Sequence, residues 1–232
     1  MANILTSSIG KKLIMSISGL FLIIFLLLHV SINFFSVIDL CTGKYGSADG
    51  LFKIGCDFMS LPIVTVMVPV LALGFIIHIV YACYLTWTNI QSRGGYNRYA
   101  VSSKAKTESF ASKNMFALGI IVLGFIAFHL THFWADMQLQ HFMGAEETDP
   151  YVLLDRTFGT WWVTALYLVW FVAIWFHLTH GFWSAFQTLG WNNAIWIKRL
   201  KVISYIVATL IFAAFATVAI AVCVHVNFPC CA

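Results

Sequence analysis

The sequence contains very little charge. Asp, Glu, Lys and Arg make up 9% of the 232 residues, whereas hydrophobic residues make up 61%. A soluble domain needs roughly 25% charged residues to form a surface that faces water. This composition excludes the soluble classes and indicates an integral membrane protein.

Metal-binding cysteine motifs are also absent. None of the six cysteines belongs to a Cys-x-x-Cys pair, a spacing typical of metal and redox sites. Cys83 and Cys223 lie in apolar runs and are expected to pack as small hydrophobic residues. Cys41 and Cys56 share one connection, where a disulfide is a weakly supported alternative that requires an oxidising compartment.

Five runs of the chain contain no Asp, Glu, Lys or Arg. Each run exceeds the roughly 20 residues that a helix needs to cross the hydrocarbon core of a bilayer. We therefore expect an all-α integral membrane protein, a single domain with five transmembrane helices at about 13–38, 61–88, 114–135, 158–189 and 202–226. The first run is long and lacks a small-residue cleavage site, so we expect a retained helix and not a signal peptide.

The charges between the runs alternate in sign along the chain. Ten of the thirteen basic residues precede the first run or lie in the second and fourth connections, and eight of the nine acidic residues lie in the first and third. The positive-inside rule predicts a cytoplasmic N-terminus and a C-terminus outside. The net charge of +4 reflects this topology and does not indicate a nucleic-acid partner.

Four of the five runs contain a histidine far from their charged flanks, namely His29, His78, His129 and His177. The last two belong to copies of one motif, Phe-His-Leu-Thr-His, at 128–132 and 176–180. Ionisable side chains inside a membrane are costly and usually functional. Four helices that each offer one histidine indicate buried metal or haem.

The depths of these histidines fall into two layers. His29 and His129 lie 10 and 7 residues from the outer acidic flank, which is about 15 and 10 Å along a helix. His78 and His177 each lie 21 residues from the outer charged flank, which is about 30 Å less any loop. Each layer joins two helices, as a bis-histidine haem requires. We therefore expect two haems, one held by each pair.

Glycines recur near three of the four histidines. A macrocycle between helices needs space close to the backbone next to its ligands, so this recurrence favours haem. Gly74 precedes His78, Gly124 precedes His129, and Gly181 follows His177. Close helix–helix packing is the alternative use of these glycines.

His132 and His180 compete for the ligand roles, because residues three apart share a helix face. His132 lies only four residues from Asp136, so we expect it near the lipid headgroups. For His180, depth in the membrane does not distinguish a ligand from a non-ligand. We expect both to contact haem propionates or a quinone instead of the iron.

Four stretches around the histidines resemble the five-helix, dihaem cytochrome b subunit of succinate:quinone oxidoreductases and quinol:fumarate reductases. They are residues 24–35, 76–85, 125–132 and 175–190, and the resemblance extends over essentially the whole chain. In the family the ligand on helix 4 stands four residues before a glycine. Here that glycine is Gly181, which selects His177 over His180.

The resemblance implies a membrane anchor of the bacterial cytoplasmic (inner) membrane with two haems b, a proximal one on His78 and His177 and a distal one on His29 and His129. It implies an iron–sulfur subunit and a flavoprotein subunit with FAD on the cytoplasmic face. Electrons would pass between these and a membrane quinone, menaquinone or ubiquinone. A dimer of heterotrimers is a further expectation.

Some relatives carry an acidic residue two positions before the ligand of helix 4, where this chain has Trp175. We therefore expect no proton relay through such a carboxylate. Candidates for the quinone site near the distal haem are Asn33, His132 and Trp134, with Asp57 as a proton acceptor. Ordinary interfacial polar and aromatic residues are the alternative interpretation.

Two other functions use intramembrane histidines. A di-iron oxygenase or desaturase needs one large histidine cluster, whereas these histidines divide between two depths. A proton-relay transporter without haem would have unliganded imidazoles and a broken helix at a central site. This transporter is the alternative that we retain.

Overall fold

The computed structural model describes residues 7–92, 109–146 and 148–228. All regular elements in these ranges are helices, and five segments are long and apolar enough to cross a membrane. They are α1 (Ser8–Thr42), α3 (Pro62–Ser92), the continuous segment Met115–Phe142, α8 (Trp161–Thr188) and α9 (Ala194–Asn227). The prediction of an all-α, five-span protein is confirmed. Arg93, Arg98, Lys104, Lys106, Glu147, Cys230 and Cys231 lie outside the described residues.

The helix ends differ from the uncharged runs that predicted them. α9 begins at Ala194 and includes three basic residues, Lys198, Arg199 and Lys201. Charge does not end a helix at the membrane surface, because long basic side chains can reach water while their stems stay in contact with apolar groups. The side chain of Asn193 caps α9 by accepting a hydrogen bond from the backbone N–H of Trp196 at 2.8 Å, which explains the earlier start.

Two connections that we expected to be loops contain helices. α2 (Leu51–Met59) follows α1, and α7 (Pro150–Phe158) precedes α8. Two shorter helices, α4 (Phe110–Lys113) and α6 (Gln140–Phe142), flank the third span. α7 has the proline-first start that suits a helix, and the carboxylate of Asp149 accepts a hydrogen bond from the N–H of Tyr151 at 2.9 Å.

The third span changes its helical form near its ligand candidate. α5 (Met115–His129) is α-helical, and it continues as the π-helix η1 (Leu130–Leu139). A π-helix is rare and is often found at functional sites. The change comes directly after His129, so that His129 and His132 lie in different kinds of helix.

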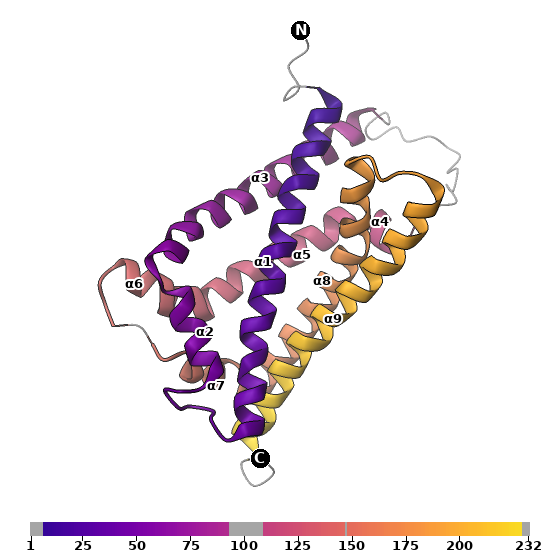
Figure 1. Cartoon of the computed structure of the whole chain (residues 1–232). Helices are drawn as coiled ribbons and strands as arrows, with labels where there is room; N and C mark the ends of the chain where they lie inside the picture. The colour runs from indigo at the N-terminus through magenta and orange to yellow at the C-terminus, as the bar shows by residue number, and fades with distance from the viewer. Residues whose placement is uncertain (1–6, 93–108, 147, 229–232) are drawn as a thin grey trace.

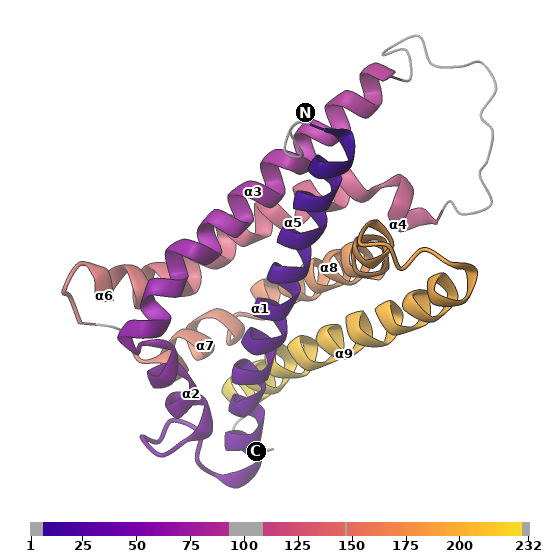
Figure 2. The same ribbon diagram turned by 45° about the horizontal axis from the view of Figure 1, so that its top comes forward.

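Helix α1 passes between two groups of helices. Figures 1 and 2 show α3 on one side of it and α8 with α9 on the other, and α1 contacts all three. α5 contacts both α3 and α8. The four helices that carry the predicted ligands therefore form a ring of neighbours.

The described residues at the two ends of this bundle differ in charge. The basic end, defined by the starts of α1 and α9 and by α4 (Figure 1), carries the described residues Lys11, Lys12, Lys113, Lys198, Arg199 and Lys201. The acidic end, defined by α2, α6 and α7, carries Asp39, Asp49, Asp57, Asp136, Glu146, Asp149 and Asp155.

The apolar core lies between α1, α8 and α9. Its members include Ile23, Tyr167, Phe171, Phe215 and Ala219. In contrast, the one buried residue of α3 is Gly74, and the one buried residue of α5 is Leu118. Lipid tails can cover such apolar helix faces without cost.

Candidate functional site

The four predicted ligands come together as two pairs. The ring centroids of His29 on α1 and His129 on α5 are 5.8 Å apart. Those of His78 on α3 and His177 on α8 are 6.3 Å apart. These are the same two pairs that the depths along the sequence predict.

Aromatic side chains surround the pair of His29 and His129. Phe25 stacks on His29 with ring centroids 5.4 Å apart, and Phe215 of α9 lies 5.9 Å from it. Trp170 of α8 lies 5.6 Å from His129. This pair therefore has aromatic, apolar surroundings.

Small residues surround the pair of His78 and His177. The Ser18 hydroxyl of α1 lies 3.4 Å from Nδ1 of His78. A Cβ at Gly19 would lie 3.2 Å from Cε1 of His78, and one at Gly119 would lie 3.6 Å from Cε1 of His177. α1 and α5 therefore approach these imidazoles closely with their backbones.

The glycines in contact with the histidines are not the ones that the sequence favoured. Gly74 packs against α1, where its Cβ would lie 2.7 Å from Phe21, so close helix packing explains it. Gly181 faces Met115, and Gly124 has no neighbour within 4 Å. Sequence reasoning looked for glycines on the same helix as each histidine, whereas Gly19 and Gly119 lie on neighbouring helices.

The ring separations within the two pairs are close to that of two imidazoles that would bind one metal ion. Two imidazoles on opposite sides of one metal, each bonded at about 2.0–2.1 Å, have ring centroids roughly 6 Å apart. Nδ1 of His129 and Nδ1 of His177 are buried and have no hydrogen-bond partner. Nδ1 of His180 and Nδ1 of His225 are also buried without a partner, so this feature is shared with histidines outside the two pairs.

The described residues form no group of three or more His, Cys, Asp or Glu that could hold a metal ion. A di-iron oxygenase would need such a group. A haem iron would need only two protein ligands, because the macrocycle supplies the others.

His132 and His180 point to different surroundings. Nδ1 of His132 lies 3.2 Å from the hydroxyl of Tyr167 in the core, and its ring lies 4.1 Å from that of Phe128. His180 lines a small cavity at the basic end and lies 5.0 Å from Trp183.

Two of the four quinone-site candidates, Asn33 and Asp57, make separate hydrogen bonds. The Asn33 amide donates to the carbonyl of His29 at 2.9 Å. Asp57 accepts from Lys53 at 2.7 Å and lines a cavity of about 150 Å³. That cavity is lined by Lys53, Cys56, Asp57, Ser60, Met137, Thr148, Asp149 and Pro150, so neither Asn33, His132 nor Trp134 lines it.

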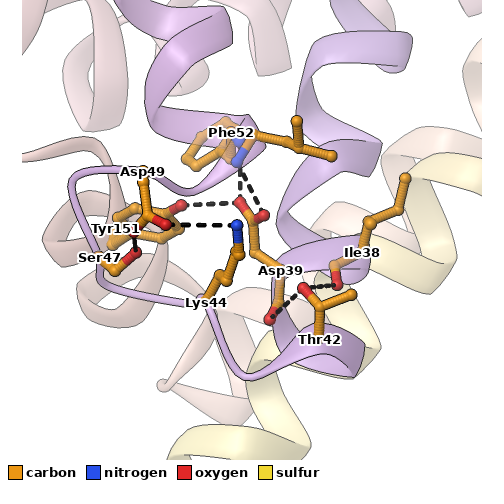
Figure 3. A network of polar contacts seen from close by, with 9 residues as sticks. Ile38, Asp39, Thr42, Lys44, Ser47, Asp49, Phe52 and Tyr151 are labelled. Carbon is orange, nitrogen blue, oxygen red and sulfur yellow. Dashed lines mark hydrogen bonds and ion pairs between the residues drawn. The ribbon is translucent and has the colours of Figure 1, made fainter.

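A buried carboxylate that the sequence analysis treated only as a flanking charge organises the acidic end (Figure 3). Asp39 has no exposed surface. It accepts hydrogen bonds from the backbone N–H groups of Leu51 and Phe52, each at 2.8 Å, and from the Tyr151 hydroxyl at 2.7 Å. Asp39 thus joins the end of α1 to the starts of α2 and α7.

Two phenols at the acidic end, Tyr151 and Tyr45, have raised pKa values. Burial and the hydrogen bond to Asp39 raise the pKa of Tyr151. Burial and a 2.7 Å hydrogen bond to Asp155 raise the pKa of Tyr45. Both hydroxyls are therefore hydrogen-bond donors.

Cys41 and Cys56 are both free thiols, so the disulfide considered from the sequence does not form in this structure. Burial raises the pKa of the Cys56 thiol to about 12. Cys41 is exposed at the end of α1.

No protein-family model, no curated protein and no solved structure matches this chain.

Proposed function

We propose that the chain is the dihaem cytochrome b membrane anchor of a succinate:quinone oxidoreductase, either a succinate dehydrogenase or a quinol:fumarate reductase. The observation that carries this proposal is the pairing of four intramembrane histidines at ring separations of 5.8 and 6.3 Å. A transporter that relays protons has no need for two imidazoles at this spacing in each of two places.

In this proposal His29 and His129 hold the distal haem, and His78 and His177 hold the proximal one. When bound, the haems supply one-electron redox chemistry. The protein positions the imidazoles on four helices and keeps water away with aromatic and aliphatic side chains. Ser18 orients His78 through its Nδ1, as a second-shell partner does for a metal-bound imidazole.

The proposal also places the chain within a larger assembly. The basic end faces the cytoplasm of a bacterium, by the positive-inside rule. There it docks an iron–sulfur subunit, which in turn binds a flavoprotein subunit with FAD. Menaquinone or ubiquinone exchanges electrons at the acidic end, where Asp57 lines a cavity.

A pyridine haemochrome spectrum of the complex purified in detergent tests the proposal, with haem counted per chain. We expect two haems b. Replacement of His78 or His177 by Ala removes the proximal haem and leaves about one per chain, and replacement of His29 or His129 removes the distal one.

His225→Ala is the matched control, because His225 is also a partly buried membrane histidine without a hydrogen bond at Nδ1, but its ring contact is with Tyr45. This variant keeps two haems. A folded complex without haem contradicts the proposal and favours the proton-relay transporter. Loss of a haem in His132→Ala but not in His129→Ala would show that the ligand chosen in the third span is wrong.

A further inference from the structure

A second cavity lies at the basic end, where its lining includes His180. It has a volume of about 130 Å³ and is lined by Ser109, Thr179, His180, Trp183, Lys201 and Tyr205. These residues come from α8, from α9 and from the position directly before α4. The volume is several times the roughly 30 Å³ that one water occupies in the liquid.

The cavity contains a cation, Lys201, that pairs with no carboxylate of the described residues. The ammonium of Lys201 lies 4.8 Å from the ring centroid of Trp183, and no ion pair joins Lys201 to an acid within the described residues. All the described Asp and Glu residues belong to the acidic end. In contrast, the basic residues of the acidic end are each paired, as Lys44 with Asp49, Lys53 with Asp57 and Arg156 with Asp136.

Further hydrogen-bonding groups converge on the same cavity. Nδ1 of His180 is buried and has no partner. Tyr205 is half exposed on α9 and brings a hydroxyl to the rim. Serine, histidine, tyrosine, tryptophan and lysine can all donate hydrogen bonds. Among the described residues, the lining therefore offers hydrogen-bond donors and one positive charge, and none of them is acidic.

We propose that this cavity binds the phosphate group of an anionic membrane lipid. A phosphate oxygen would accept from Lys201 and His180, and the acyl chains would lie along the exposed apolar surface of α9 around Tyr205. Basic pockets between transmembrane helices on the cytoplasmic side are suited to such headgroups. The binding of lipid here does not depend on haem, so it stands apart from the proposed function.

A haem propionate offers the same oxyanion chemistry, since His180 lies one turn from His177. The experiment must therefore separate the two sources. The complex is stripped of lipid in detergent, supplied with phosphatidylglycerol or phosphatidylcholine, and measured by native mass spectrometry for lipid bound per chain. Haem is counted in the same samples.

We expect one bound phosphatidylglycerol per chain, and we expect that phosphatidylcholine does not displace it. Lys201→Gln weakens its binding about tenfold or more, the loss expected for a charge-assisted hydrogen bond, and Lys201→Arg restores most of it. Lys198→Gln is the matched control, because Lys198 is on the same helix turn but does not line the cavity, and it leaves binding unchanged.

Three results overturn the proposal. Equal losses in Lys198→Gln and Lys201→Gln would show a general attraction to basic residues. An unchanged lipid count in Lys201→Gln together with loss of haem would assign the cavity to a propionate. Absence of any retained phosphatidylglycerol in the wild-type complex would show that no lipid site exists. Absence of haem alone would contradict the proposed function and leave the lipid result intact.

Discussion

At the scale of single residues, Asp39 shows how an acid can be buried at the end of a membrane helix. A buried charge is costly unless hydrogen bonds replace its contacts with water. Asp39 obtains three, two from backbone N–H groups at the start of α2 and one from Tyr151. The carboxylate also lies where the positive end of the α2 backbone favours a negative charge.

Gly50 is required by the space around this carboxylate. Any residue can adopt the backbone φ of −67° at Gly50. A Cβ at this position, however, would lie 2.0 Å from the Tyr151 hydroxyl oxygen. We expect Gly50→Ala to lower the free energy of unfolding by about 1–3 kcal/mol, the usual cost of overpacking. Thermal unfolding in detergent measures it.

The same clash predicts a coupling between two positions. Tyr151→Phe removes the oxygen that the new Cβ would meet, so Gly50→Ala costs less in a Tyr151→Phe background than in the wild type. A double-mutant cycle gives the difference. Additive effects would show that Tyr151 is not what restricts Gly50.

Cys56 and Cys41 differ in their expected reactivity. The pKa of Cys56 is raised by burial from 9.0 to about 12, which lowers its thiolate fraction about a thousandfold at pH 8, and thiolate is the reactive form. We expect iodoacetamide at pH 8 to modify exposed Cys41 while Cys56 stays unmodified, as peptide mass spectrometry can measure. Equal rates at the two sites would contradict this burial.

At the scale of elements, the π-helix η1 begins between the two histidines of its motif, directly after His129. In an α-helix, residues three apart share a face, so His129 and His132 would compete for one ligand position. In η1 the backbone turns more widely. Nδ1 of His132 lies 3.2 Å from the Tyr167 hydroxyl, and the ring of His129 also lies 6.2 Å from the ring of Tyr167. The sequence motif at 176–180 is nearly the same, yet α8 stays α-helical throughout. Local sequence therefore did not reveal η1.

Tyr45 attaches the connection between α1 and α2 to α7 by its hydrogen bond to Asp155. This contact predicts that the stability of the fold falls at alkaline pH. An unfolded tyrosine has a pKa near 10, whereas burial raises that of Tyr45 above this value. Its contribution to stability is therefore complete below about pH 10 and is lost as the pH rises further, by up to about 1.4 kcal/mol per pH unit.

Comparison of unfolding temperatures at pH 8 and pH 11 tests this dependence. We expect a large fall for the wild type and a smaller one for Tyr45→Phe, which has no phenol to ionise but is less stable at pH 8 because it lacks the bond to Asp155. Equal falls would mean that Tyr45 does not remain protonated in the fold.

At the scale of the whole molecule, the two charged ends predict how the chain lies in the membrane. Cys41 is exposed at the acidic end, and Lys198 is exposed at the basic end. In intact spheroplasts we expect a membrane-impermeant maleimide to label Cys41. A Lys198→Cys variant is labelled at that position only after permeabilisation. The reverse pattern would contradict the orientation and the proposed docking of partners at the basic end.

The five spans and the pairing of the histidines were predictable, whereas the helix ends and the glycine contacts were not. Hydropathy indicated where lipid is the solvent, and depth alone indicated which histidines lie at the same level. The start of α9 at Ala194 depends on a cap at Asn193, and the contact of Gly19 with His78 depends on how α1 is rotated toward α3.

The sequence by itself determined a five-helix membrane protein with one basic and one acidic end and with histidines at two depths, because apolar length and charge act locally along the chain. Only the tertiary structure decided which backbone lies against each imidazole, that Asp39 is buried and joins three helices, and that Lys201 and His180 share a cavity. These features depend on the rotation of each helix about its own axis, which is set by packing against residues far away in the sequence.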